Sequence, residues 1–331
     1  MNDKNRYGIL IIGLGILILI ILVASTFIGR YSLTFKEVIE SFSSGDSENI
    51  KKAVLFDIRI PRIIMSFVVG IGLSVAGTTY QAVLMNPLAS PDVLGTSSAA
   101  AFGAAAGILL FPSSFIMTCL LSFLFGLLSI FMVFAISKLK KNQEIITIVL
   151  SGMIVGSVFM SMIAVVKYLA DTEDTLPAIT FWLMGSFSSI NREQLIFTLP
   201  IFAICFLIIY FLRWKLNIIS LGDEEAIVSK IDPGKLRFLV LTTASVIVSL
   251  SVTVAGVVGW VGLVIPHLAR TIVGYNHGKL VPISGLIGGV FLLLIDDIAR
   301  SIGFSEIPIG MLTALIGAPI FMILFIKGEN Q

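Results

Sequence analysis

The sequence predicts an all-α membrane protein of about ten transmembrane helices. Of its 331 residues, 57% are hydrophobic and only 13% are charged, and the mean hydropathy is +1.04. No water-soluble fold buries so large an apolar fraction. Uncharged segments of about 20 residues recur along the chain, and each can cross the ~30 Å hydrocarbon layer of a bilayer as one helix. We therefore expect residues 1–331 to form a single transmembrane domain.

Ten segments satisfy this length requirement. The uncharged run 93–137 would form a helix of ~68 Å, and Pro112 divides it into two spans. The run 238–274 holds two more, because Gly256, Gly259, Gly262 and Pro266 interrupt it. The segment 175–191 is too short to span, so we expect it at the outer interface with Trp182 as an anchor. The remaining six spans are expected at 8–29, 63–84, 145–166, 194–212, 280–295 and 307–326.

The charges between the spans predict the orientation. An even number of spans places both termini on one side of the membrane. If that side is cytoplasmic, the inner loops hold twelve basic residues and the outer loops nine, and the short loop 137–143 has three lysines and no acid. This bias predicts a multi-pass protein with both termini in the cytoplasm.

The most polar stretch of the chain is the inner loop 213–237. We expect it to contain one or two short helices that end at the Asp232-Pro233-Gly234 turn. Its acidic first part consists of Ser220, Leu221, Gly222, Asp223, Glu224, Glu225 and Ala226.

Two parts of the chain also echo each other. Val75-Ala76-Gly77, Leu84, Pro87 and Gly95 are matched by Val254-Ala255-Gly256, Leu263, Pro266 and Gly274, each pair 179 positions apart. The first copy ends a helix that runs inward and the second a helix that runs outward. This pattern predicts an inverted repeat that relates spans 2–5 to spans 7–10, which is typical of transporters.

Composition excludes several other functions. The 22 basic and 20 acidic residues leave no polycationic surface for nucleic acid. Neither an HExxH nor a CxxC motif is present, and two histidines cannot build a histidine-rich metal site. The chain also lacks a phosphate-binding loop. We expect no enzymatic activity and no bound metal or cofactor, so any ATP is hydrolysed by a partner.

Few ionisable residues lie within the spans. They are Arg270 in the eighth span and the pair Asp296-Asp297 in the ninth. Asp296 can pair with Arg300 one helical turn away, or it can be the coupling carboxylate of an ion-driven secondary transporter. For His267 we expect hydrogen-bonded packing rather than contact with a substrate.

Two arginines precede the second span in the sequence Arg59-Ile60-Pro61-Arg62. Their guanidinium groups suit docking to carboxylates of another protein. The alternatives are interfacial snorkelling or charge pairing with Asp57.

These motifs together resemble the FecCD family, the permease subunits of ABC importers for iron-siderophores, haem and vitamin B12. The resemblance extends from about residue 55 to residue 326. It rests on Arg59 to Arg62, Asn86-Pro87-Leu88-Ala89 with Gly95, Phe181 to Ser186, Leu221-Gly222, Gly262 to Arg270 with Pro266 and His267, Asp296 with Ala299-Arg300, Ile307-Pro308-Ile309-Gly310, and Thr313 to Pro319.

The resemblance implies a permease in a bacterial cell membrane. It implies a homodimer or heterodimer with a second permease, two cytoplasmic ATPases that hold ATP and Mg²⁺, and an extracytoplasmic binding protein or lipoprotein. Arg59, Arg62 and Arg300 would face that binding protein, and the loop 220–235 would couple to the ATPase. The fifth and tenth spans would line the passage. An iron-siderophore is the expected cargo, with haem or vitamin B12 as alternatives.

The chain departs from the family pattern at two positions of the coupling loop. Lys230 stands where a glycine is common, and Ile227 stands where an arginine is common. We therefore expect the turn after the short helix to differ from the family pattern.

Overall fold

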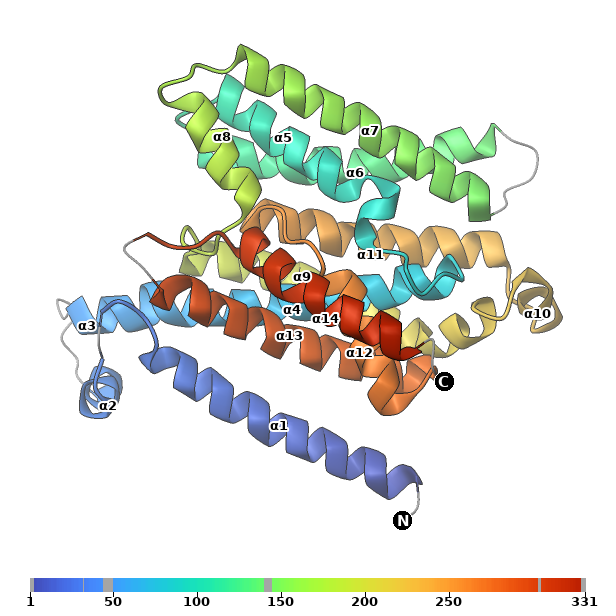
Figure 1. Cartoon of the computed structure of the whole chain (residues 1–331), viewed down its shortest axis with the longest axis horizontal. Coiled ribbons are helices and arrows are strands. Elements are labelled where there is room, and N and C mark those ends of the chain that lie inside the picture. The colour runs from blue at the N-terminus through green and yellow to red at the C-terminus, as the bar shows by residue number, and fades with distance from the viewer. Residues whose placement is uncertain (1–2, 32, 44–49, 140–144, 303–304, 329–331) are drawn as a thin grey trace.

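The computed structural model describes residues 3–31, 33–43, 50–139, 145–302 and 305–328. Within these ranges the regular structure is helical, and ten helices follow one another in the order of the ten expected spans (Figure 1). They are α1 (Asp3–Phe27), α4 (Ile60–Val83), α5 (Thr96–Leu110), α6 (Phe115–Lys138), α7 (Ile145–Leu169), α9 (Arg192–Ile219), α11 (Pro233–Ala255), α12 (Val261–Val273), α13 (His277–Ser301) and α14 (Ile309–Gly328).

Shorter elements join these helices. They are α2 (Phe35–Ser43), α3 (Ile50–Ala53), the π-helical turn η1 (Val54–Arg59), the 3₁₀ turn η2 (Pro91–Leu94), α8 (Thr175–Met184) and α10 (Asp223–Val228). Seven of the helical segments within the described ranges are long and apolar enough to cross a bilayer, including the continuous stretch 50–83. The all-α membrane fold predicted from the sequence is therefore confirmed.

The breaks between helices follow local chemistry. Pro112 separates α5 from α6 as expected, and the Ser114 hydroxyl accepts the Met117 N–H at 3.3 Å to cap α6. In the run 238–274, the chain leaves α11 at Gly256, which has a φ of +69°. The sequence analysis expected Pro266 to interrupt this run as well, and this was wrong, because Pro266 lies buried inside α12. The break is therefore confined to 256–260.

Helix α4 lies at the centre of the bundle, in contact with α9, α11, α12 and α13. Glycines allow these close approaches. A Cβ on Gly77 would lie 1.8 Å from the carbonyl oxygen of Gly262 in α12, and one on Gly70 would lie 2.2 Å from that of Gly288 in α13. Helices in lipid associate through such small residues because their backbones can then pack directly.

The bundle has two distinct ends, which we call the α8 end and the α10 end. Figure 1 shows α2, α3 and α8 at one end, and α10 at the other, together with the start of α1 and the end of α14. Both termini thus lie at the same end, as an even number of crossings requires. The cytoplasmic location of the α10 end and the inverted repeat stay predictions.

Candidate docking and coupling sites

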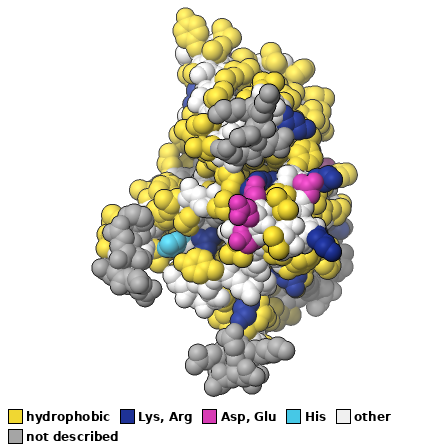
Figure 2. Space-filling view, turned by 90° about the vertical axis from the view of Figure 1, so that its right-hand side faces the viewer, with side chains coloured by type: hydrophobic (Ala, Val, Ile, Leu, Met, Phe, Trp, Pro, Cys, Tyr) yellow, Lys and Arg dark blue, Asp and Glu magenta, His cyan; other side chains and the backbone are white. Residues whose placement is uncertain are grey.

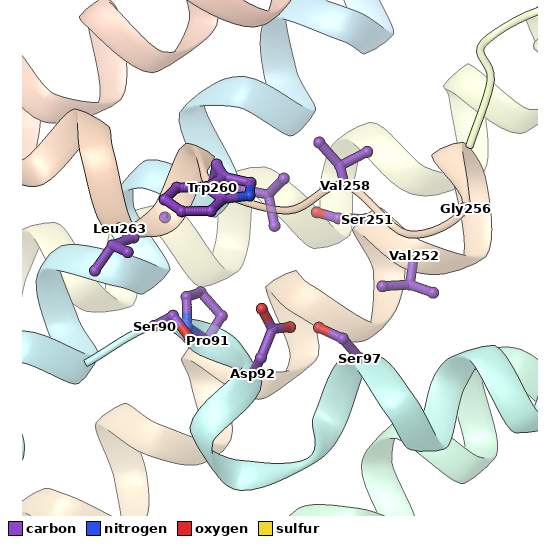
Figure 3. A pocket seen from close by; sticks show the side chains of 12 residues that line it. Ser90, Pro91, Asp92, Ser97, Ser251, Val252, Gly256, Val258, Trp260 and Leu263 are labelled. Atoms are coloured by element: carbon purple, nitrogen blue, oxygen red, sulfur yellow. The ribbon is translucent and has the colours of Figure 1, made fainter. Parts of the chain in front are cut away.

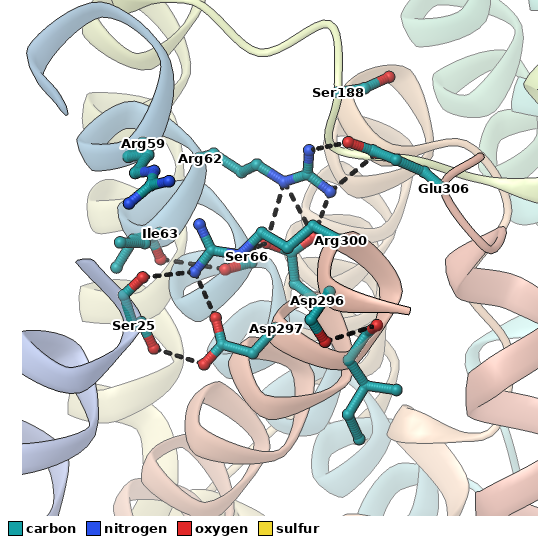
Figure 4. Close-up of polar contacts among 12 residues, drawn as sticks. Ser25, Arg59, Arg62, Ile63, Ser66, Ser188, Asp296, Asp297, Arg300 and Glu306 are labelled. Carbon is teal, nitrogen blue, oxygen red and sulfur yellow. Dashed lines mark hydrogen bonds and ion pairs between the residues drawn. The ribbon is translucent and has the colours of Figure 1, made fainter. Parts of the chain in front are cut away.

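The α8 end gathers the three arginines singled out in the sequence (Figure 4). Arg62, in the first turn of α4, lies at the centre of this arginine cluster. Its Nε and Nη2 donate to Asp296 at 2.9 to 3.1 Å, and its Nη1 and Nη2 donate to Glu306 at 2.8 and 3.0 Å. Asp296 is 0% exposed. A buried carboxylate of this kind persists because a guanidinium compensates its charge.

Arg300 extends the cluster to the first helix. It donates to the carboxylate of Asp297 and, at 2.7 Å, to the carbonyl of Ser25 in α1. The Ser25 hydroxyl donates to Asp297 at 2.6 Å. The expected pairing of Arg300 with Asp296 is present only at 3.9 Å. The closest partner of Asp296 is Arg62, 234 positions earlier in the chain.

Arg59 differs from the other two arginines in having no carboxylate partner among the described residues. It donates to the carbonyls of Thr26, at 2.7 Å, and Tyr31. The pairing of Arg59 with Asp57 considered from the sequence is not formed in the structure.

All three arginines, which the resemblance assigns to docking of the binding protein, are buried within this chain. Arg59, Arg62 and Arg300 are each 5% exposed. They border a cavity of about 210 Å³ that Tyr31 and Glu306 also line. Apart from Asp297, which precedes Arg300 by three residues on α13, their partners come from segments far away in the chain. A role in docking stays a prediction, and any incoming carboxylate has to reach the arginines through this cavity.

The coupling loop at the α10 end is shorter than the sequence suggested. Because α9 continues to Ile219 and α11 begins at Pro233, only residues 220–232 lie between them. This coupling segment contains one short helix, α10, followed by a turn. The turn places Lys230 at a φ of +58°, where glycine is normally favoured, and the Ile231 N–H donates to the Ala226 carbonyl at 2.8 Å.

One side of the coupling segment is exposed, and its other side is bound to α11. Leu221 is 71% exposed and Val228 84%, and Ile227, Glu224 and Glu225 are exposed as well. Figure 2 faces this end of the molecule and shows acidic side chains gathered beside apolar ones.

Two acidic residues of this segment have internal partners. Asp223 binds the buried Arg237 of α11, with Nη1 donating at 2.9 Å. Asp232 caps α11, because its carboxylate accepts the Lys235 N–H at 3.0 Å, which lowers the pKa of Asp232. Both contacts join the coupling segment to α11.

The remaining motif residues are chiefly structural. Gly95 has a φ of +71° and would place a Cβ 2.7 Å from the backbone of Gly156. Gly310 would place one 2.6 Å from the Met184 carbonyl. Pro308 directly precedes α14, and Pro87 is exposed in the turn after α4. These residues shape the backbone where helices begin, end or cross.

His267 packs as expected but without the expected hydrogen bond. Its ring lies edge-on to Phe321 with 6.1 Å between the ring centroids. Its buried Nδ1 has no hydrogen-bond partner in the described part of the chain. Across the same described residues, no group of three or more His, Cys, Asp and Glu side chains is placed to hold a metal ion.

One polar feature escaped the sequence analysis. Figure 3 shows the Asp92 carboxylate pointing into a small cavity beside Ser97, with Trp260 and Ser251 on the facing wall. Asp92 directly precedes the uncharged run 93–137, so a carboxylate at the start of this run could have been noticed in the sequence. The left-handed backbone of Trp260, with a φ of +70°, had no signal in the sequence.

Comparison with known proteins agrees with this architecture. The molybdate import permease MolB of Haemophilus influenzae is 38% identical over 329 residues, covering 98% of this chain and 97% of MolB. The Fe(3+)-citrate import permease YfmE of Bacillus subtilis is 34% identical, covering 98% and 96%. A solved structure described as an inward-facing, metal-chelate type ABC transporter has a TM-score of 0.88 and 38% identity, covering 96% of this chain and 99% of that one.

A protein-family model also matches most of the chain. The FecCD transport family matches residues 17–327, which include the arginine cluster, the coupling segment and all ten spans apart from the start of the first. Taken with the full-length relatives, this match shows that the chain belongs to the FecCD transport family and is a membrane permease of an ABC importer.

Proposed function

We propose that this permease carries an iron-siderophore complex and that cytoplasmic ATPase subunits drive it by docking on the coupling segment. The observation that carries the proposal is the exposure of α10. Apolar side chains at Leu221, Ile227 and Val228 stand beside the carboxylates of Glu224 and Glu225. A contiguous apolar patch with a charged rim is typical of a protein interface. A partner with an apolar groove and basic edges would cover this surface.

The attachment of α10 provides a route for movement. The ion pair between Asp223 and Arg237 links α10 to the second turn of α11. Helix α11 is the most buried of the long described helices and contacts α4, α5, α6 and α9. Pressure on α10 would therefore displace several helices together. In a dimer with a second permease, such a displacement would open the passage alternately to the two sides.

The arginine cluster is the site we assign to the binding protein. Arg59 has no carboxylate partner within the described residues and borders the cavity at the α8 end. A carboxylate of the binding protein that entered the cavity would pair with Arg59. Arg62 and Arg300 already have internal carboxylates, so their contribution would be to the positive potential of the cavity.

The relatives support two cargoes. YfmE, which is named for Fe(3+)-citrate, supports an iron chelate. MolB, with 38% identity along nearly its full length, makes molybdate the second candidate. The two differ greatly in size, since one is a chelate and the other a small tetrahedral anion.

Uptake into proteoliposomes tests the cargo. The permease would be reconstituted with its ATPase and binding protein, with ATP inside or outside the vesicles to select either orientation. We expect ATP-dependent accumulation of ⁵⁵Fe-siderophore and none of ⁹⁹Mo-molybdate. The reverse result would replace the cargo, and accumulation without the ATPase under an ion gradient would overturn the proposal.

Copurification tests the coupling segment. The double variant Ile227→Asp with Val228→Asp should abolish ATPase copurification, because two charges would enter an apolar contact. Glu224→Lys with Glu225→Lys should weaken it by reversing the charged rim. The control is Lys235→Ala at the same end, where the side chain is 89% exposed. Full ATPase recovery with both double variants would remove α10 from the interface.

A further inference from the structure

Glu306 borders the cavity that the arginine cluster lines at the α8 end (Figure 4). It lies between α13 and α14, outside a helix. Its carboxylate accepts from Nη1 of Arg62 at 2.8 Å and from Nη2 at 3.0 Å, and it has no other partner in the described part of the chain. The opposite edge of the same guanidinium, formed by Nε and Nη2, binds Asp296 at 2.9 to 3.1 Å. Arg62 therefore lies between two carboxylates.

The two carboxylates that bind Arg62 differ in their exposure. The side chain of Asp296 is 0% exposed and belongs to the long helix α13. The side chain of Glu306 is 30% exposed. Breaking a buried ion pair leaves an uncompensated charge, whereas water replaces much of an exposed one. A further carboxylate that reached Arg62 would therefore displace Glu306 and leave Asp296 in place.

The charges around the cavity show how Glu306 affects an approaching acid. Asp296, Asp297 and Glu306 together balance the three guanidinium groups of the arginine cluster, and the exposed Arg30 adds one positive charge at the cavity. Among the described residues that border the cavity, Glu306 alone is acidic. It would repel an incoming carboxylate, because like charges at close range are unfavourable. Its departure would remove this repulsion and uncover two N–H donors of Arg62.

We propose that Glu306 is an internal competitor of the binding protein. It occupies Arg62 in the undocked permease and gives way when an acidic side chain of the binding protein enters the cavity. This inference rests on the docking role proposed above for the arginine cluster. The entering carboxylate takes the N–H groups that Glu306 leaves, so the buried guanidinium keeps two carboxylates throughout. The occupied state lowers the apparent affinity for docking, because only permeases with a released Glu306 can accept the partner.

Docking affinity of the permease–ATPase complex in lipid nanodiscs tests this inference, with the binding protein of the uptake assay as the probe. Nanodiscs leave both ends of the permease accessible. Glu306→Gln keeps the size of the side chain and removes its charge. It should tighten docking about tenfold, because a hydrogen bond to a charged group contributes a factor of about ten or more. Glu306→Ala should tighten docking at least as much, since alanine cannot reach Arg62. Docking that neither variant tightens would overturn the inference.

A matched control separates the competitor from a general effect of charge. Glu40 lies in α2 at the same end, its side chain is 59% exposed, and it pairs with Lys36 at 3.8 Å. It does not border the cavity. Glu40→Gln should therefore leave docking unchanged. Equal gains for Glu40→Gln and Glu306→Gln would show that docking responds only to net charge, which contradicts the proposal.

The salt dependence of docking gives a second measurement. In the unmodified permease one carboxylate replaces another at Arg62, so the number of ion pairs there stays the same. In Glu306→Gln, docking adds an ion pair. Salt screens such interactions where water reaches them, so added NaCl should weaken docking of Glu306→Gln more than docking of the unmodified permease. Equal salt dependence would contradict the exchange.

Arg59→Gln distinguishes a failure of this inference from a failure of the proposed docking site. It should weaken docking if the binding protein enters the cavity. If Arg59→Gln weakens docking and neither Glu306 variant tightens it, the competitor role is wrong and the docking site stands. If docking is insensitive to all three variants, the binding protein does not use this cavity and both proposals are wrong.

Discussion

Charged residues are buried in the arginine cluster at the α8 end of the molecule and exposed on the coupling segment at the α10 end. At the α8 end, Arg62 and Arg300 are buried against Asp296 and Asp297, which come from another part of the chain or the next turn. At the α10 end, Glu224 and Glu225 are exposed. Both sets of charged residues lie next to transmembrane spans, and nothing in the local sequence distinguishes the set that is buried from the set that is exposed. The difference shows that burial depends on whether a distant helix supplies the opposite charge.

The largest expected effect is at the buried end. Arg62→Leu would leave Asp296 buried without its closest counterion, and breaking such a pair from one side costs about 3–5 kcal/mol. The free energy of unfolding in mixed micelles measures this loss. Asp296→Asn should cost a similar amount, and the double variant less than the sum, because both changes remove one interaction.

A matched control at the same end sharpens this prediction. Lys36 pairs with Glu40 at 3.8 Å, and both side chains are largely exposed. Lys36→Leu should leave the Tm unchanged, since exposed ion pairs contribute little. If Arg62→Leu were as well tolerated as Lys36→Leu, the arginine cluster would not stabilise the α8 end.

A smaller loss is expected where the coupling segment meets α11. Asp223→Ala would deprive the buried Arg237 of its carboxylate, and Arg237 Nε already lacks a partner in the described part of the protein. An unsatisfied buried donor costs about 1–3 kcal/mol. The Asp223 side chain is 45% exposed, so water can replace part of the interaction and the lower half of that range is expected. A loss equal to that of Arg62→Leu would contradict the contrast between the ends.

A gain is expected at the turn after α10. Lys230 has a φ of +58°, a conformation that costs a residue with a Cβ about 1–2 kcal/mol and glycine almost nothing. Lys230→Gly should raise stability by up to about 1 kcal/mol, because greater freedom of the unfolded chain offsets part of the gain. Thermal unfolding in detergent measures the shift. A lower Tm for Lys230→Gly would mean that the Lys230 side chain stabilises the turn.

The smallest effect on stability is expected on the exposed face of α10. Val228→Asp should change the free energy of unfolding by no more than about 0.5 kcal/mol, as for other surface substitutions. A loss above 2 kcal/mol would show that Val228 packs within the chain and is not available to a partner.

The order of the ten main helices could be predicted from the sequence alone. Apolar runs such as 145–166 cross a bilayer whatever their neighbours are, because every backbone polar group is satisfied within the helix. The break at Pro112 was also predictable, since proline removes a hydrogen-bond donor and clashes with the preceding turn. Pro266 was misjudged because it sits in the second turn of α12, whose start was not visible in the sequence.

The candidate sites could be predicted only in part. A short helix in the loop 213–237 was predicted from its polar stretch, and α10 forms there, whereas the exposed apolar side chains of Ile227 and Val228 were not predicted. The burial of Arg62 and Arg300 could not be predicted, because it requires Asp296 and Glu306 to reach Arg62, and Ser25 to reach Arg300, from distant segments. The cavity at Asp92 and the strained Trp260 likewise depend on how loops pack between helices.

The sequence by itself determined that this chain crosses a membrane as a helical bundle and where each crossing lies, because transfer of apolar side chains into lipid is a property of each segment alone. Only the tertiary structure decided which charges are buried, which glycines meet and which surface of α10 remains open. These outcomes depend on contacts between helices far apart in the chain, such as Arg62 with Asp296 and Gly77 with Gly262. Such contacts are specified jointly by both partners, and no single segment carries their signature.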